Sequence, residues 1–139
     1  MSQPPPFSPT VTLLTVSRVW EAAFTDGLKP LGLTTRKYGL LGHIRGTPGI
    51  SFSELARRSR ITVQSAHTAV AAFVESGLVD DSTAHAGAAS TLRITAEGES
   101  LLARAAEVVA RLDEEFAAQH PELTEALRAH LVRVMSATD

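Results

Sequence analysis

Two helix-start signals eleven residues apart constrain the middle of this chain more than any other feature. Ser51 and Glu54 stand in the S-x-x-E relation of a capping box, in which the Ser51 hydroxyl bonds the Glu54 amide and the Glu54 carboxylate returns to the Ser51 amide. Residues 60–61 then form a tight turn, and Thr62 is placed to cap a second helix that runs to Gly77. Two helices joined by so short a turn make a helix-turn-helix.

A short hairpin is expected directly after the second of these helices. Leu78 and Val79 start an extended segment, and residues 91–94 alternate apolar and polar side chains as a partner strand would. Residues 80–90 are small and polar and are expected to form a mobile hairpin tip. The hairpin is therefore the wing of a winged helix-turn-helix.

Helical patterns flank this unit on both sides. Prolines keep residues 1–7 extended, and a Ser-Pro start opens a helix over 8–27 whose apolar residues cover more than one side, which indicates burial between subunits. A further helix is expected over 34–46. Thr95 and Pro121 then open two amphipathic closing helices.

Size and composition exclude several classes of protein. The 139 residues suit one compact unit, and an apolar run of about 18 residues, which a membrane span needs, is missing, as is a signal peptide. We therefore expect a soluble cytoplasmic protein. Cysteine is absent, so disulfides and thiolate metal sites are excluded. Five histidines include no H-x-x-x-H pair, and we expect no functional metal site and no cofactor.

Motifs of enzymatic chemistry are missing too. The sequence has no Gly-rich phosphate loop, no G-x-S-x-G elbow and no H-E-x-x-H pair. The acidic run at 113–115 is better explained as a solvated helix face than as a pair of catalytic carboxylates. We expect that the chain is not an enzyme.

Charge is divided unevenly along the chain, although the net charge is only −2. Between residues 36 and 63, six cations accompany the single anion Glu54, whereas residues 97–127 carry eight anions and two arginines. This distribution is typical of a basic module with an acidic appendage. However, no Lys or Arg occurs from Ile61 through Leu92, a span that covers the second helix of the helix-turn-helix and the wing.

The order of the expected elements, together with several local sequences, resembles the MarR family of bacterial regulators. The resembling segments are Leu33-Thr34 with Tyr38 and Leu40-Leu41, Ser53-Glu54-Leu55-Ala56, Gly77-Leu78-Val79, and Ile94-Thr95-Ala96-Glu97-Gly98. They resemble the start of that family's second helix, its third helix, the entry to its wing and the L-T-x-x-G exit. The resemblance covers nearly the whole chain.

The resemblance implies a mainly α (α+β) fold, a winged helix-turn-helix with N- and C-terminal dimerisation helices. Residues 1–33 would be an arm and the first dimerisation helix, 34–95 the DNA-binding region, and 96–139 the closing dimerisation helices. The implied activity is transcription regulation by a homodimer, whose recognition helices enter successive major grooves of double-stranded DNA at a pseudo-palindromic operator. The DNA-contacting residues implied are Ser53, Arg57, Arg60, Thr62, Gln64, Ser65, His67, Thr68 and Arg93.

The chemistry of these side chains leaves two interpretations open. Gln pairs bidentately with adenine, and Ser, Thr and neutral His exchange hydrogen bonds with several bases, but the same residues also suit a solvated helix face. The wing tip lacks the family's arginine, so affinity is expected to be weak unless His67 or His85 supplies charge when protonated. The alternative function is a winged-helix dimer with a neutralised DNA face that acts as a protein-interaction module.

The family resemblance also implies a small-molecule effector, aromatic or phenolic, in a cleft between the dimerisation helices and the winged unit. The candidate lining residues are Trp20, Phe24, Tyr38, His43 and Arg45. Trp20 and Tyr38 are equally well explained as core residues, and His43 as a polar residue on a helix surface.

Overall fold

The computed structural model describes residues 3–81 and 91–137, and the hairpin tip expected at 80–90 falls mostly outside these described residues. The elements in chain order are α1 (Pro9–Leu28), a 3-10 turn η1 (Lys29–Leu31), α2 (Thr35–Gly46), α3 (Phe52–Ser59), α4 (Val63–Glu75), β1 (Val79–Asp80), β2 (Arg93–Ile94), α5 (Ala96–Gln119) and α6 (Pro121–Ser136). The mainly α fold with a small sheet is confirmed.

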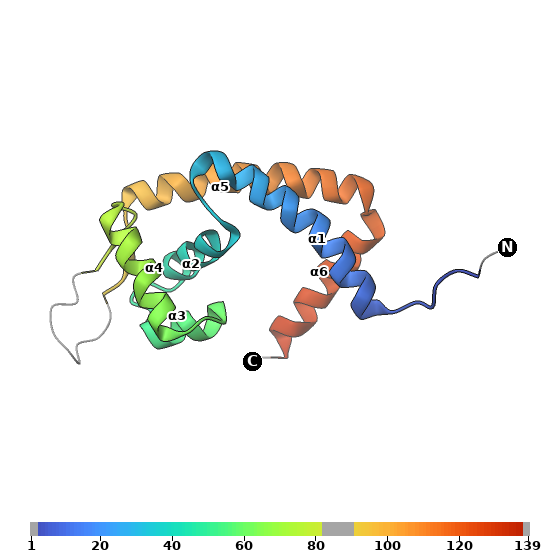
Figure 1. The fold of residues 1–139 in the computed structure, drawn as a ribbon, viewed down its shortest axis with the longest axis horizontal. Coiled ribbons are helices and arrows are strands. Elements are labelled where there is room, and N and C mark those ends of the chain that lie inside the picture. Colours follow the sequence, from blue (N-terminus) through green and yellow to red (C-terminus); the bar gives the residue numbers. More distant parts are fainter. Residues whose placement is uncertain (1–2, 82–90, 138–139) are drawn as a thin grey trace.

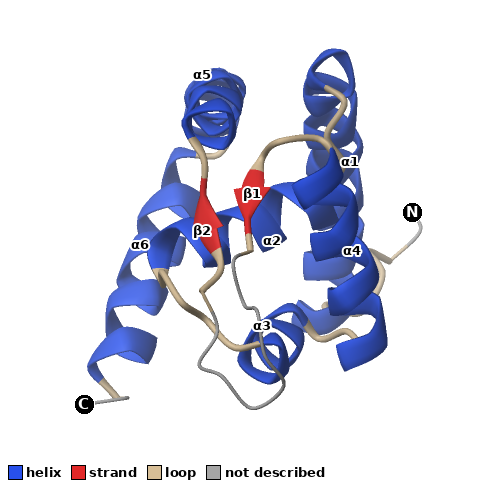
Figure 2. Cartoon of the chain, turned by 90° about the vertical axis from the view of Figure 1, so that its left-hand side faces the viewer, coloured by secondary structure: helices blue, strands red, loops and turns tan. Residues whose placement is uncertain are grey.

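The helices form an arch (Figure 1). α5 runs along its top, α1 rises from its start near α6 to meet α5, and α6 folds back from the end of α5 on the side where α1 begins. The winged unit of α2, α3 and α4 lies at the other end, with α3 farthest from α5. Figure 2 shows the two strands between α5 and the lower helices of this unit.

Side-chain caps set the start of five helices, and all five caps expected from the sequence are confirmed. The hydroxyls of these residues accept hydrogen bonds from amides three residues further on, at 3.0–3.2 Å; they are Ser8, Thr34, Ser51, Thr62 and Thr95. Each cap satisfies an amide that has no partner within its helix, and is worth about 1 kcal/mol.

The second half of the expected capping box is wrong. The Ser51 hydroxyl accepts from the Glu54 amide at 3.1 Å, but the Glu54 carboxylate does not return to the Ser51 amide. It turns instead toward Arg57 and Arg58, one turn further along α3. Charge-assisted hydrogen bonds to two guanidinium groups are stronger than one to a neutral amide.

The core lies inside the winged unit and beneath the first half of α5. Its largest fully buried side chains are Leu28, Leu40, Leu41, Ile44, Leu55 and Leu92. Full burial of a Leu or Ile stabilises the fold by about 1.5–3 kcal/mol. From α4, Ala66, Val70 and Phe73 face this core, which leaves the opposite face of α4 uncovered.

The base of the wing is fastened to the start of α5. Val79 pairs with Ile94 in an antiparallel register, and the Thr95 hydroxyl donates to the Gly77 carbonyl at 2.6 Å. Gly98 lies so close to the Leu78 backbone that a Cβ on residue 98 would be 2.4 Å from the Leu78 carbonyl oxygen. The glycine of the L-T-x-x-G segment is thus required by contact between backbones.

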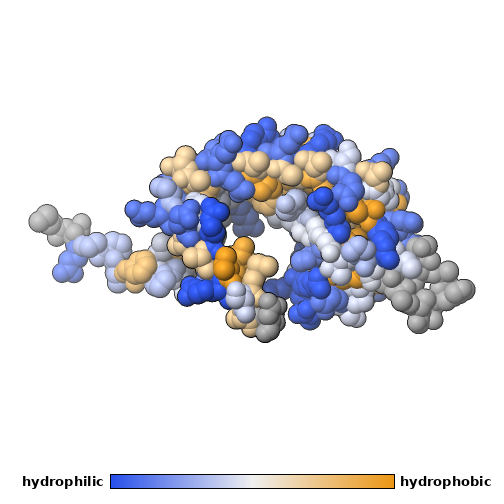
Figure 3. Space-filling model, turned by 180° about the vertical axis from the view of Figure 1, so that it is seen from behind, coloured by the Kyte–Doolittle hydropathy of each residue, from blue (hydrophilic) through white to orange (hydrophobic). Residues whose placement is uncertain are grey.

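Apolar side chains remain exposed on α1 and α6. On α1 these are Val11, Leu13, Leu14 and Val19, and on α6 Leu127, Leu131, Val132, Val134 and Met135. Figure 3 shows apolar atoms gathered over the end of α6, beside the hollow that separates it from the winged unit. In the described part of the chain, no helix is long and apolar enough to cross a membrane.

Candidate nucleic-acid interface and effector pockets

The uncovered face of α4 is polar and neutral. Gln64 and Thr68 are exposed, and the Thr68 hydroxyl donates back to the Gln64 carbonyl at 3.0 Å, so this bond uses the backbone of residue 64 rather than its side-chain amide. Ser65, one of the expected DNA-contacting residues, is half-buried and forms hydrogen bonds with Thr62 through both its amide and its hydroxyl. Thr62 therefore fixes the first turn of α4 while Gln64 and Thr68 present themselves to solvent.

Arg36, which sequence reasoning did not include among the DNA contacts, lies beside this face. It lines a shallow surface hollow together with Gln64, Ser65 and Thr68. Arg36 comes from the first turn of α2, so its position depends on how α2 packs in the unit. In the sequence, the only signal for Arg36 was that it belongs to the basic segment 36–63, which does not indicate which way its side chain points.

His67 is placed by an aromatic contact. Its imidazole stacks on the Phe52 ring with centroids 3.9 Å apart and planes inclined by 16°. The stack ties α4 to the start of α3 and fixes the direction of the ring. His67 is nonetheless exposed on the same helix as Gln64, so it stays a candidate for contact with DNA.

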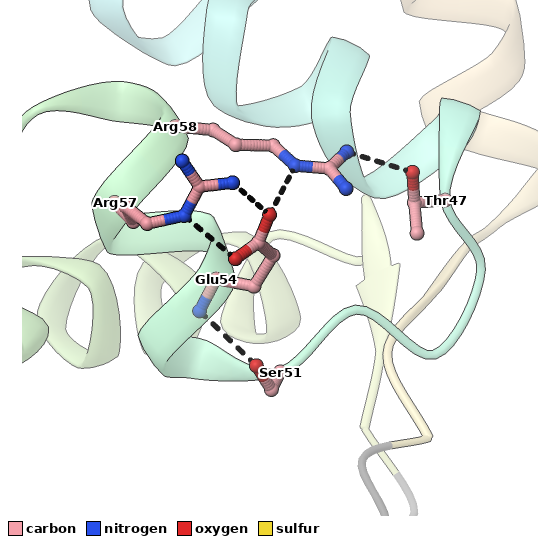
Figure 4. Close-up of polar contacts among 5 residues, drawn as sticks. All are labelled: Thr47, Ser51, Glu54, Arg57 and Arg58. Carbon is pink, nitrogen blue, oxygen red and sulfur yellow. Dashed lines mark hydrogen bonds and ion pairs between the residues drawn. The ribbon is translucent and has the colours of Figure 1, made fainter. Parts of the chain in front are cut away.

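The cations of α3 are joined through one carboxylate, as Figure 4 shows. Glu54 accepts from Arg57 Nε at 2.9 Å and from Arg58 Nε at 2.8 Å, while Arg58 Nη1 donates to the Thr47 hydroxyl at 3.0 Å. Hydrogen bonds from Arg57 and then Arg58 lower the pKa of the Glu54 carboxyl to about 2. The Glu54 carboxylate is therefore ionised at neutral pH, and both arginines of α3 donate to it.

The remaining expected phosphate contacts are exposed around the helix-turn-helix. Ser53 lies on the outer face of α3, and Arg60 occupies the turn with φ 55°, a left-handed conformation that few non-glycine residues adopt. Arg93 lies on β2, where its Nη1 donates to the Leu92 carbonyl at 2.9 Å. These residues come from α3, from the turn before α4 and from β2, whereas α4 itself contains no Lys or Arg.

The five expected effector residues are divided between two pockets. Trp20 and Phe24 line an apolar pocket of about 200 Å³ between α1 and α5, completed by Val109, Leu112, Asp113 and Phe116. Tyr38, His43 and Arg45 line a second pocket of about 630 Å³ between α2 and α5, completed by Gly39, Gly42, Gly46, Leu102 and Ala106. The Phe24 and Tyr38 rings meet edge to face, 5.3 Å apart, so the pockets are neighbours rather than one cleft.

The larger pocket carries an ion pair between the winged unit and α5. Arg45 Nε lies 2.9 Å from Glu99 Oε2, and both side chains are about half exposed. An exposed pair of this kind is worth at most about 1 kcal/mol. The ion pair therefore holds the Arg45 side chain only weakly.

Comparisons with known proteins agree with this architecture. The sequence model described as MarR family matches residues 31–88. The transcriptional repressor Rv2887 of Mycobacterium tuberculosis, an HTH-type protein, is 31 % identical over 102 residues, which are 73 % of each chain. This chain belongs to the MarR family. The family consists of transcription regulators.

Solved structures of family members extend the likeness to most of the chain. Rv2887 in complex with DNA has a TM-score of 0.76 at 27 % identity and covers 93 % of this chain and 98 % of its own. Rv2887 in complex with salicylic acid has a TM-score of 0.71 at 25 % identity, with 94 % and 98 % covered. MepR of Staphylococcus aureus, with a TM-score of 0.73 at 15 % identity, shares the fold.

Proposed function

We propose that this chain is a DNA-binding transcription regulator, acting in the cytoplasm as a homodimer on a pseudo-palindromic operator and released by a small aromatic or phenolic ligand. It is a repressor in this proposal and not an enzyme. The observation that carries the proposal is the uncovered polar face of α4, fixed by the Thr62 cap and flanked by Arg36. A capped helix with an outward polar face suits insertion into a major groove.

Base readout is assigned to Gln64, His67 and Thr68, with Ser65 as a weaker contributor because its hydroxyl is already bonded to Thr62. A Gln side chain offers one acceptor and two donors, which match N6 and N7 of adenine. Phosphate contacts are assigned to Ser53, Arg57, Arg60 and Arg93, and we add Arg36 because it lies beside the same face. These contacts fix the register of the protein on the duplex without reading sequence.

Dimerisation is assigned to the apolar faces of α1 and α6. Nine large apolar side chains there are between 46 % and 65 % exposed in the single chain. Contiguous apolar surface of this kind marks interfaces, because a monomeric protein gains nothing by leaving it in water. Residues 1–33 and 96–139 would form the dimer unit, and 34–95 the DNA-binding unit.

Effector binding is assigned to the pocket between α2 and α5. Its walls combine the Tyr38 ring with the Arg45 guanidinium, a pairing that suits an aromatic acid. The relative Rv2887 has been solved with salicylic acid, a ligand of this class. When the ligand carboxylate takes Arg45 from Glu99, the link between the winged unit and α5 is broken, and the spacing of two α4 helices in a dimer would change.

Two observations favour the second function, a protein-interaction module. No Lys or Arg lies between Ile61 and Leu92, and Glu54 engages both arginines of α3. A weak positive field lowers the affinity for any duplex. Such a surface would suit a protein partner.

The two functions are separated by fluorescence anisotropy with a labelled random-sequence duplex of about 30 base pairs at low salt. The DNA-binding proposal expects saturable binding at micromolar protein that weakens as salt is raised. Absence of any binding under these conditions would leave only the interaction module.

A further inference from the structure

The arginines of α3 carry less free charge than the sequence indicates. Arg57 and Arg58 both donate to the carboxylate of Glu54, from one and the same side of α3 (Figure 4). Two guanidinium groups and one carboxylate leave a net charge of one at this corner of the candidate DNA face. The Arg58 side chain is tied down further by the Thr47 hydroxyl.

The Glu54 carboxylate is not required to start α3. The Ser51 hydroxyl already caps the helix by accepting from the Glu54 amide, and this bond uses the backbone of residue 54 rather than its side chain. The carboxylate therefore has no role in the cap, and it contacts the two arginines instead. The Glu54 carboxyl is ionised at neutral pH, because hydrogen bonds from Arg57 and Arg58 lower its pKa to about 2.

We propose that Glu54 is a built-in counterion that limits the sequence-independent affinity of this chain for DNA phosphates. This inference rests on the proposed DNA-binding function. A phosphate that approaches Arg57 or Arg58 competes with a carboxylate already hydrogen-bonded to both, so each protomer gains roughly one phosphate contact fewer than its cations suggest. Low phosphate affinity makes release from DNA easy, which allows a weak effector to switch the protein.

The test compares the E54Q variant with wild type across a salt series, on the random duplex and on an operator selected from a random library. Gln keeps the size of Glu but removes its charge. Each restored phosphate contact steepens the slope of log affinity against log salt by about 0.9, so two per dimer add about 1.8. The ratio of E54Q to wild-type affinity should then grow about tenfold between roughly 200 mM and 50 mM salt.

Two further variants separate this effect from others. E107Q makes the same change of charge on the exposed face of α5, away from α3, and should leave the salt slope unchanged. R57Q introduced into E54Q should return the slope close to that of wild type, because this corner then again carries one net positive charge. Phosphate contacts do not read the base sequence. The ratio of operator affinity to random-duplex affinity should therefore differ by less than about twofold between E54Q and wild type.

The outcomes are distinct. A steeper slope and tighter binding by E54Q on both duplexes supports the proposal. Unchanged or weaker binding by a folded E54Q, with an unchanged slope, overturns it and assigns Glu54 to ordering the arginines instead. Absence of duplex binding by both wild type and E54Q defeats the proposed function itself, and this inference with it.

Discussion

Replacing Gly98 with alanine tests how the wing is fastened to α5. The new Cβ would lie 2.4 Å from the Leu78 carbonyl oxygen and 2.6 Å from Ile94 Cδ1. The Ile94 side chain can rotate away, but the Leu78 carbonyl belongs to the backbone that leads into β1 and also accepts from the Thr95 amide at 3.1 Å. The clash is therefore relieved only by moving the base of the hairpin away from α5.

The expected change in the free energy of unfolding combines two costs and one gain. Overpacking in a tight site costs about 1–3 kcal/mol, and loss of the Thr95 to Leu78 hydrogen bond adds about 1 kcal/mol. Alanine regains about 0.5–1 kcal/mol of helix propensity over glycine. The net expectation is a loss of about 2 kcal/mol in the free energy of unfolding.

Urea unfolding followed by far-UV circular dichroism, at one fixed protein concentration, measures this difference. With a denaturant slope of about 2 kcal/mol/M, the G98A midpoint should fall by about 1 M. G42A is the matched control, because Gly42 is likewise helical but, unlike Gly98, is exposed, and a Cβ there would meet no atom within 4 Å. The G42A variant should be stabilised by about 0.5–1 kcal/mol. A G98A midpoint equal to that of wild type would refute the close approach of α5 to the wing.

Three further predictions concern the dimer, the effector and acid. L131D places a charge on the exposed apolar face of α6 and should convert the proposed dimer to monomer in analytical ultracentrifugation; a dimer that persists in L131D would exclude this face from the interface. E99Q frees Arg45 and should tighten salicylate binding by up to about fivefold in calorimetry, whereas unaltered affinity would remove Arg45 from the site. The difference in the free energy of unfolding between wild type and E54Q should be constant from about pH 7 to 5 and should disappear as the pH falls from 4.5 through about 2, because the folded-state pKa of Glu54 is lowered. A difference that disappears above about pH 5 would contradict the ion pairs.

Features set by neighbours in sequence could be predicted, and those set by packing could not. The caps at Ser51, Thr62 and Thr95 are bonds across three residues, and all were predicted. The partner of the Glu54 carboxylate was not, because two arginines a turn away compete with the amide that the capping box assumes. Local signals are reliable only where no stronger partner lies within reach.

The candidate sites show the same division. The outward face of α4 follows from helical spacing, since Ala66, Val70 and Phe73 must face the core. The position of Arg36 beside that face, and the division of the effector residues between two pockets, depend on how α1, α2 and α5 pack together. No spacing in the sequence contains that information.

The most direct test of the central claim is the affinity of the Q64A/S65A double variant for an operator selected with the wild-type protein. We predict a loss of at least about tenfold on the operator, from one lost bidentate contact per half-site, and little change on a random duplex. The control is the S100A/Q119A double variant, which alters two exposed polar residues of α5 and should bind as wild type. Operator affinity equal to that of wild type in Q64A/S65A would contradict the claim that α4 reads DNA.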